Sequence, residues 1–84
     1  MKNIAIVTGA SGGLGREFVR LLLEMPEVDE IWAMARSRDK LEALAEELGD
    51  KVKPYPIDLS DVEAIKAFGE SLKTADVRIP FLIN

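Results

Sequence analysis

The sequence contains no cysteine and no histidine among its 84 residues. Without cysteine there is no disulfide and no thiolate metal site, and without histidine the chain lacks the commonest metal ligand and the usual general base. We therefore predict no metal site. No apolar run approaches the roughly 18 residues that a membrane-spanning helix needs. The short apolar run after Lys2 is not typical of a signal peptide, so we expect a cytoplasmic protein with no membrane partner.

The charge of the chain is modest and spread out. The formal net charge is −4, and the 11 basic residues form no run or stripe. This distribution disfavours nucleic acid and anionic membranes as partners, but it is compatible with a small phosphate ligand. At this length the chain is one small domain or part of a larger protein.

Short apolar runs alternate with amphipathic stretches along the chain. The runs at residues 4–7, 31–35, 51–57 and 81–83 have the length of strands. The pattern predicts a first helix over residues 14–25, a second with Ser37 as N-cap and Gly49 beyond its end, and a third opened by a capping box of Ser60 and Glu63. The residues expected to face the core are Phe18, Leu21, Leu22 and Met25 in the first helix, Leu41, Leu44, Ala45 and Leu48 in the second, and Ile65, Phe68 and Leu72 in the third.

The resulting order, β-α-β-α-β-α-β, predicts an α/β fold with a parallel sheet. Pro54 and Pro56 place the third strand at a sheet edge, because a proline cannot donate to a central ladder. The economical strand order is then 3-2-1-4, half of a doubly wound (Rossmann) sheet, with two helices on one face and the third on the other. In that order Thr8, Gly9 and Asn84 meet at the switch point, where such sheets bind ligands.

The stretch TGASGGLG, residues 8–15, joins the first strand to the first helix. Gly9 suits the positive φ of an immediate turn, Gly13 leaves the backbone open to a pyrophosphate, and Gly15 allows the helix to pack closely on its strand. The helix N-terminus adds free N–H groups and a positive dipole end, which makes the loop a candidate anion cradle. The alternative is a tight turn with no ligand. The loop's place between an apolar strand and an amphipathic helix favours the cradle.

The loop spacing, Gly-x-x-x-Gly-x-Gly, is similar to the TGxxxGxG cofactor loop of the short-chain dehydrogenase/reductase family. Residues 58–61, DLSD, resemble the family's Asp-Leu or Asp-Val pair after the third strand, and FLIN, residues 81–84, resembles the start of its Asn-Asn-Ala-Gly segment. The resemblance covers the whole chain and implies that residues 1–84 are an N-terminal cofactor-binding portion, with the Asp58 carboxylate on the adenine amino group. Asp58 could instead be only a residue of the turn before the third helix. The residues that the resemblance implies for dinucleotide binding are Gly9, Ser11, Gly13, Leu14, Gly15, Asp58, Leu59 and Asn84.

The end of the second predicted strand bears on the choice of cofactor. Dinucleotide folds place a carboxylate about 20 residues beyond the loop to hold the ribose 2′-OH. Ala35 stands where NAD-preferring family members carry Asp, and Arg36 and Ser37 follow with a guanidinium and a hydroxyl suited to a 2′-phosphate. By resemblance we expect NADP rather than NAD. Arg36 could instead be a solvated loop charge, which is the favoured interpretation for Arg38. Arg16, in the first turn of the first helix, is expected to be an exposed helix charge rather than a phosphate ligand.

The family's catalytic Tyr, the Lys four residues beyond it and the substrate-binding Ser lie after the fourth strand and are absent here. The residue four positions after Tyr55 is Leu59 rather than Lys, so Tyr55 is expected to be an edge-strand residue. Trp32 is expected in the core. The resemblance implies that the parent protein is an NADP(H)-dependent oxidoreductase acting on a carbonyl or alcohol substrate, and that this chain alone, with no catalytic residue, is inactive. The alternative is a non-catalytic half-Rossmann module that binds a nucleotide or a partner.

The predicted sheet leaves apolar surface uncovered. One face carries two helices and the other only one, so part of the first two strands should lie bare. The outer edge of the strand at 81–83 carries no proline or charge in those three residues, and prolines guard only the opposite edge. We therefore expect a homo-oligomer in which two copies pair along this edge, with a marginal monomer as the alternative.

Overall fold

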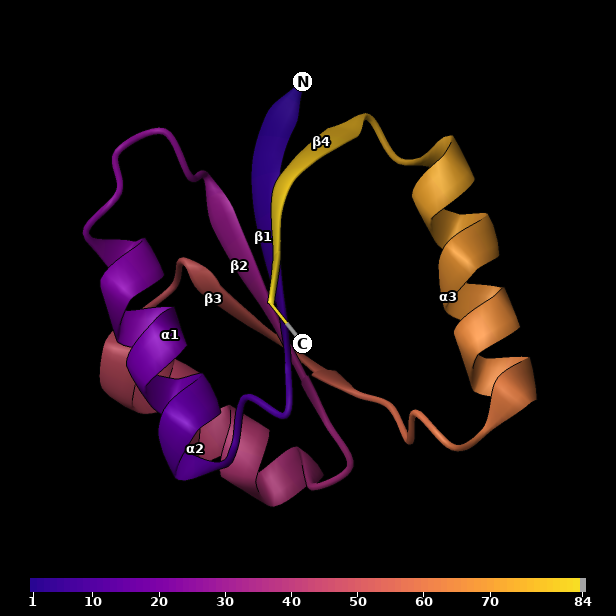
Figure 1. Cartoon of the computed structure of the whole chain (residues 1–84), viewed down its shortest axis with the longest axis horizontal. Coiled ribbons are helices and arrows are strands. Elements are labelled where there is room, and N and C mark those ends of the chain that lie inside the picture. The colour runs from indigo at the N-terminus through magenta and orange to yellow at the C-terminus, as the bar shows by residue number, and fades with distance from the viewer. Residues whose placement is uncertain (84) are drawn as a thin grey trace.

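The computed structural model describes residues 1–83, which form alternating strands and helices (Figure 1). In chain order the elements are β1 (Lys2–Thr8), α1 (Gly13–Leu23), β2 (Glu30–Ala35), α2 (Arg38–Leu48), β3 (Val52–Pro56), α3 (Val62–Thr74) and β4 (Val77–Ile83). This alternation confirms the predicted α/β class.

The strands form one parallel sheet in the order β3-β2-β1-β4. Helices α1 and α2 cover one face of this sheet, and α3 lies over the other (Figure 1). The strand β3, with Pro54 and Pro56, is at an edge and pairs only with β2 among the described strands. The order, the edge strand and the distribution of the helices are those predicted, half of a doubly wound sheet.

The central strand β1 buries side chains on both faces of the sheet. Ala5 and Val7 belong to the core beneath α1 and α2, while Ile4 and Ile6 belong to the core beneath α3. This division follows from the two-residue period of a strand, whose successive side chains point to opposite faces. Because the side chains of β1 are buried on both faces, its apolar residues form a continuous run.

An aromatic cluster fills the core on the α3 side. Trp32 is only 7% exposed, and its ring lies 4.8 Å from that of Tyr55 and 5.9 Å from that of Phe68, measured between centroids. The predictions of Trp32 as a core residue and of Tyr55 as an edge-strand residue are confirmed. Burial raises the pKa of the Tyr55 phenol, and the charge of Glu30 raises it further.

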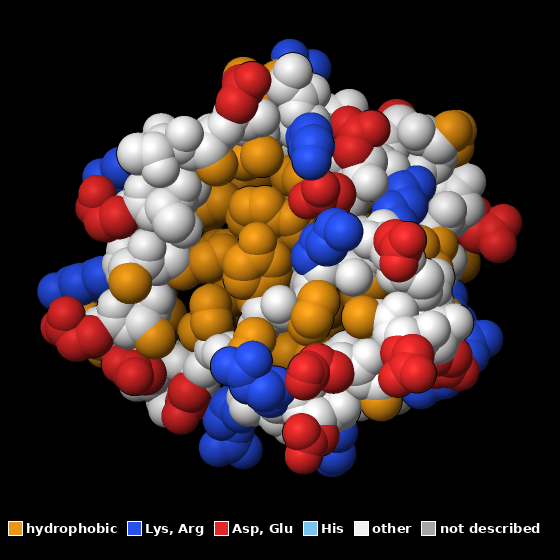
Figure 2. All heavy atoms as spheres, turned by 180° about the vertical axis from the view of Figure 1, so that it is seen from behind, with side chains coloured by type: hydrophobic (Ala, Val, Ile, Leu, Met, Phe, Trp, Pro, Cys, Tyr) orange, Lys and Arg blue, Asp and Glu red, His pale blue; other side chains and the backbone are white. Residues whose placement is uncertain are grey.

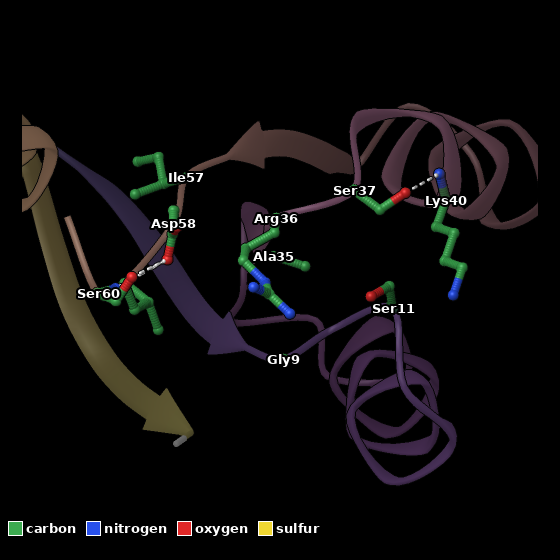
Figure 3. Close-up of a pocket in the computed structure, with 10 residues that line it drawn as sticks. Gly9, Ser11, Ala35, Arg36, Ser37, Lys40, Ile57, Asp58 and Ser60 are labelled. Atoms are coloured by element: carbon green, nitrogen blue, oxygen red, sulfur yellow. Dashed lines mark hydrogen bonds between the residues drawn. The ribbon is translucent and has the colours of Figure 1, made fainter.

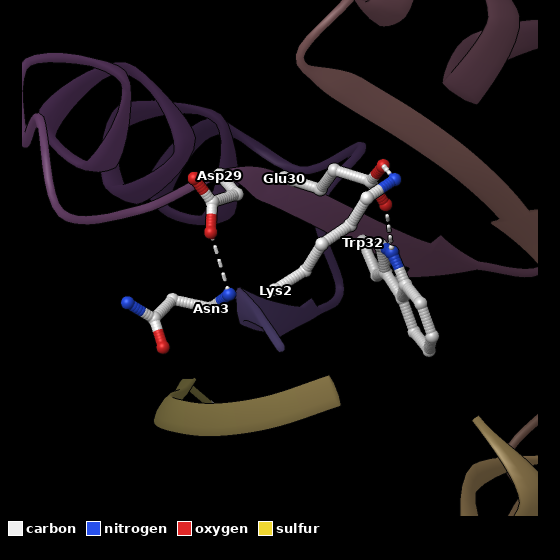
Figure 4. Close-up of polar contacts among 5 residues, drawn as sticks. All are labelled: Lys2, Asn3, Asp29, Glu30 and Trp32. Carbon is white, nitrogen blue, oxygen red and sulfur yellow. Dashed lines mark hydrogen bonds and ion pairs between the residues drawn. The ribbon is translucent and has the colours of Figure 1, made fainter. Parts of the chain in front are cut away.

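Polar contacts join the starts of β1 and β2 at the end of the sheet away from the glycine loop (Figure 4). The Lys2 ammonium lies 2.8 Å from the Glu30 carboxylate, which also accepts a 3.0 Å hydrogen bond from the Trp32 indole. The Asn3 N–H donates to the Asp29 carboxylate at 2.7 Å. The bonds from Lys2 and then Trp32 lower the pKa of Glu30 against the opposing effect of burial.

Helix α1 turns toward the core the face that was predicted at Phe18, Leu22 and Met25, and the prediction is wrong at Leu21. Val19 and Leu22 are buried, whereas Leu21, predicted to face the core, is 64% exposed. At Gly15 the helix packs against the backbone of Gly9 and Ala10. Gly15, Val19 and Leu22 recur at i, i+4 and i+7 and so share one face. Leu21 falls on the opposite side of the helix from Val19.

Helix α2 agrees closely with the prediction. The Ser37 hydroxyl accepts a hydrogen bond from the backbone N–H of Lys40, Leu41 and Leu44 are buried, and Gly49 follows the helix with a φ of 107°. A residue with a side chain is strained at such a φ, so glycine suits this end of the helix.

The N-cap of α3 is Asp61 and not Ser60, so the predicted capping box is wrong. The Asp61 carboxylate accepts hydrogen bonds from the N–H groups of Glu63 and Ala64. Ser60 instead donates both its N–H and its hydroxyl to Asp58, which draws it into the preceding turn and starts the helix one residue later.

Strand β4 begins four residues earlier than predicted and includes Arg78 and Pro80. Its register against β1 shifts between Asn3 and Ala5, where Ile79 and Pro80 have no regular partner. A proline has no N–H to donate, so it weakens strand pairing at this edge. The expectation that prolines guard only the opposite edge is therefore wrong.

An apolar groove of about 270 Å³ lies between α3 and the sheet. It is lined by Ile6, Phe68, Leu72, Ile79 and Leu82 among others, and Leu82 is 67% exposed. Figure 2 shows hydrophobic side chains gathered in a hollow on this side of the molecule. Ile65, predicted to face the core, is 42% exposed, and no residue of α3 is fully buried. The exposed apolar surface thus lies on α3 and β4. The expectation that part of the first two strands lies bare is wrong, because their side chains on this face are buried.

Candidate functional site

The loop between β1 and α1 makes an abrupt turn at Gly9. Gly9 has a φ of 64°, the left-handed region that favours glycine, as predicted. Beyond it, the Ala10 N–H donates to the Met34 carbonyl at 3.2 Å and the Gly12 N–H returns to the Gly9 carbonyl at 3.1 Å. The loop is therefore held against the end of β2, and Ala10 is buried.

Gly13 and Gly15 differ in what surrounds them. A Cβ atom on Gly15 would meet the backbone of Gly9 and Ala10 at 2.2–2.9 Å, whereas one on Gly13 would meet no atom within 4 Å. Gly15 is thus closely packed as predicted, but against the backbone of the loop rather than against the strand. The space outside Gly13 is open to a ligand.

The first turn of α1 offers donors without protein acceptors. Its N-cap is Gly12, which has no side chain to accept a hydrogen bond from the N–H groups of the first turn. Within residues 1–83, the N–H groups of Gly13, Leu14 and Gly15 bond to no acceptor. Free N–H groups at the positive end of a helix dipole form a site suited to an anion.

A cavity of about 720 Å³ opens beside this loop, at the carboxyl ends of β1, β2 and β3 (Figure 3). Three segments far apart in the sequence contribute to it, with Gly9 and Ser11 from the loop, Ala35, Arg36, Ser37 and Lys40 from the β2–α2 junction, and Ile57, Asp58, Leu59 and Ser60 from the turn after β3. This is the edge of an open α/β sheet at which ligands bind.

Asp58, just after β3, and Arg36, just after β2, both line the cavity but differ in their partners. Asp58 accepts the Ser60 N–H at 2.9 Å and the Ser60 hydroxyl at 2.7 Å, both on Oδ1. These bonds lower the pKa of Asp58, with a smaller contribution from the charge of Arg36, so Asp58 is a carboxylate held in one orientation. The Arg36 side chain, by contrast, forms no salt bridge or hydrogen bond within residues 1–83.

Arg16 is directed to a different place. Its guanidinium is bonded to the Glu47 carboxylate of α2, which Arg20 also approaches at 3.7 Å. Neither Arg16 nor Arg38 lines the cavity. Arg16 therefore joins α1 to α2.

The comparisons with known proteins identify the family. A profile of the short-chain dehydrogenase family matches residues 3–84. The chain belongs to the short-chain dehydrogenase family. Members of this family bind NAD(P), and the sheet order and the TGASGGLG loop described above match the predicted resemblance.

Two relatives and one solved structure illustrate the similarity. The chain is 38% identical to nodulation protein G of Rhizobium sp. (strain N33) over 80 residues, which cover 95% of this chain and 32% of that protein. It is 36% identical to a probable NADP-dependent dehydrogenase of Dichelobacter nodosus over 81 residues, 96% of this chain and 74% of that one. A metagenomic short-chain oxidoreductase in complex with NADP superposes with a TM-score of 0.79 and 32% identity, covering 95% of this chain and 37% of that chain.

The chain thus spans about a third of the length of the nodulation protein and of the NADP-bound oxidoreductase. None of the helices within residues 1–83 has the length and apolar character needed to cross a bilayer. At the switch point, the Thr8 hydroxyl donates to the Ile83 carbonyl at 3.3 Å, which joins the ends of β1 and β4 as predicted. Asn84, also expected there, lies outside the described residues.

The cavity brings together most of the residues predicted for the cofactor, namely Gly9, Ser11, Arg36, Ser37, Asp58 and Leu59. Gly13, Leu14 and Gly15 do not line it and lie in the adjoining first turn of α1. Lys40 and Ser60 line it and were not predicted to do so. The N-cap at Ser37 was a usable signal for Lys40, because it sets Lys40 in the first turn of α2.

Proposed function

We propose that this chain is the NADP(H)-binding portion, residues 1–84, of an oxidoreductase that transfers a hydride between the cofactor and a carbonyl or alcohol substrate. The observation that carries the proposal is Arg36, a guanidinium that lines the cavity and has no salt bridge within residues 1–83. Ala35 beside it offers no carboxylate for a ribose 2′-OH. A free guanidinium at this point favours a 2′-phosphate through charge and its forked geometry.

Each part of the cofactor has a suitable partner in this proposal. The N–H groups of Gly13, Leu14 and Gly15 bind the pyrophosphate, and the oriented Asp58 carboxylate accepts a hydrogen bond from the adenine amino group. The other members of the proposed set are Gly9, Ser11, Ser37, Leu59 and Asn84. When bound, the nicotinamide supplies or accepts the hydride. The NADP in the similar metagenomic oxidoreductase supports this choice of cofactor.

The substitution Arg36→Asp tests the choice of cofactor. Removing a charge-assisted contact costs about 1.5–3 kcal/mol, so NADP⁺ affinity should fall roughly ten- to a hundredfold, while a carboxylate at this point should improve NAD⁺ binding. The matched control is Arg38→Asp, which makes the same charge change two residues away and outside the cavity. Equal affinities of the unmutated chain for NADP⁺ and NAD⁺ would contradict the proposal.

The 84-residue chain itself is proposed to be inactive, because no Tyr, Lys and Ser set for proton transfer is present. Positioned acid–base groups typically contribute about 10²–10⁴-fold to rate. The purified chain, mixed with NADPH and a panel of aldehydes and ketones, should consume no NADPH above the buffer blank. Consumption that rises with protein concentration would contradict this proposal and favour an unrecognised catalytic group within residues 1–84.

We further propose that the isolated chain forms a homo-oligomer through its α3 face and β4. The apolar groove beside α3 and the exposed Leu82 give a surface that a second copy can cover. Because Pro80 weakens pairing at the start of β4, the copies would meet along residues 81–83. Light scattering over a range of concentrations should give a mass above 9.3 kDa. A concentration-independent monomer mass would contradict this proposal.

A further inference from the structure

The cations of the described chain divide into bonded and free groups. Arg16 and Arg20 both approach Glu47, and Lys2 pairs with Glu30. By contrast, the side chains of Arg36 and Lys40 form no hydrogen bond or salt bridge within residues 1–83, and both line the cavity. The chain as a whole is acidic, with a net charge of −4, so two free cations at one cavity mark a place for an anion.

The position of Lys40 follows from the start of α2. The Ser37 hydroxyl accepts the Lys40 N–H at 3.3 Å, which fixes the backbone of Lys40 one turn from the strand end that carries Arg36. From there its side chain runs toward the glycine loop and Ser11 (Figure 3). Arg38, two residues earlier on the same helix, is exposed and does not line the cavity.

The glycine loop supplies no cation of its own to this place. Residues 9–15 include no Lys or Arg, and Arg16, which follows them, is held by Glu47. An anion bound between the loop and the end of β2 therefore has Arg36 and Lys40 as its available positive partners. The carboxylate of Asp58 lies at the turn after β3 and is bonded to Ser60.

We propose that Lys40 is a second ligand of the 2′-phosphate of NADP(H), which it contacts from α2 while Arg36 contacts it from the end of β2. This inference rests on the proposed function and adds a specificity-determining residue to it. A flexible lysine acts as a point charge, whereas an arginine binds through a fork. Lys40 therefore contributes charge to the phosphate, and Arg36 contributes charge and geometry.

The experiment compares two nucleotides that differ only in this group, adenosine 2′,5′-bisphosphate and adenosine 5′-monophosphate, by calorimetry on the 84-residue chain. In Lys40→Met the preference for the bisphosphate should shrink by up to about fivefold, the upper end for an exposed ion pair, with monophosphate affinity unchanged. Arg38→Met removes the same charge from the same turn and should keep the preference. Lys40→Arg should keep it as well.

The outcomes separate the two claims. A preference in Lys40→Met equal to that in Arg38→Met, while the unmutated chain still prefers the bisphosphate, overturns the role of Lys40 and leaves the NADP proposal standing. Equal or absent binding of both nucleotides by the unmutated chain overturns the NADP proposal, and the role of Lys40 with it. Because Lys40 is exposed, Lys40→Met should fold, and its thermal midpoint should match that of Arg38→Met.

Discussion

A Cβ atom on Gly15 would lie 2.2 Å from the carbonyl oxygen of Gly9. The first turn of α1 therefore rests directly on the backbone of the loop that precedes it. The atoms that this Cβ would meet belong to the backbone and not to a flexible side chain, so a side chain at position 15 has to displace the helix or the loop.

Gly15→Ala should consequently destabilise the fold. Overpacking of a closely packed contact typically costs about 1–3 kcal/mol, and here the contact is with backbone. The midpoint of urea unfolding should fall. The matched control is Gly69→Ala, within α3, where a Cβ meets nothing and where the change should raise stability by about 0.5–1 kcal/mol. Equal stability of Gly15→Ala and the unmutated chain would contradict the contact.

Gly13→Ala should separate binding from folding. A Cβ at this position meets no protein atom, so the free energy of unfolding should stay the same or rise by up to about 1 kcal/mol. The methyl group would nevertheless occupy the space proposed for the pyrophosphate and should weaken NADP⁺ binding. Calorimetry with the folded variant measures the effect, and unchanged NADP⁺ affinity would remove Gly13 from the proposed site.

Asp61→Ala and Ser60→Ala should affect different properties. Asp61 caps α3, and losing such a cap costs about 1 kcal/mol of stability. Ser60→Ala should leave α3 capped but raise the pKa of Asp58, because the hydroxyl of Ser60 is the main cause of its lowering. Chemical denaturation measures the first effect, and an NMR titration of the Asp58 carboxyl carbon measures the second. The reverse pattern would restore Ser60 as the cap.

The Lys2–Glu30 pair should make stability depend on pH in the acidic range. The pKa of Glu30 is lower in the folded chain than in the unfolded one, chiefly because of its bond from Lys2. The unfolded chain then binds more protons in acid. The contribution of the Glu30 carboxylate to stability is fully present above the ordinary Glu pKa of about 4.3, and it is lost as the pH falls through the lowered pKa of the folded chain. In Glu30→Gln the midpoint of urea unfolding should change less between neutral pH and this acidic range than in the unmutated chain. The same change with pH in both proteins would contradict the prediction.

The strand order was predictable because its determinants are local. Pro54 and Pro56 exclude β3 from the sheet interior, and the apolar run at β1 requires burial on both faces. The turn at Gly9 and the cap at Ser37 likewise depend on neighbouring residues in the chain. Such features appear in sequence as residue type and spacing.

The features that sequence reasoning missed depend on contacts between segments or on competition between similar residues. In α1 the predicted stripe holds at Phe18, Leu22 and Met25 but not at Leu21, which lies on the side of the helix opposite the buried Val19. Ser60 and Asp61 both suit an N-cap, and the bond of Ser60 to Asp58 decides between them. The cap at Ser37 places Lys40 in the first turn of α2, but the cavity that Lys40 lines also needs the glycine loop, which is far from it in the sequence.

Proton–nitrogen NMR spectra of the labelled chain during titration with NADP⁺ test the central proposal most directly. We expect the amide signals of Gly9, Ser11, Gly13, Arg36 and Asp58 to shift, while those of Lys2 and Asp29, at the opposite end of the sheet, stay in place. With NAD⁺ the shifts around Arg36 should be smaller. Shifts confined to the opposite end of the sheet, or no shifts with NADP⁺, would contradict the assignment of this cavity to the cofactor.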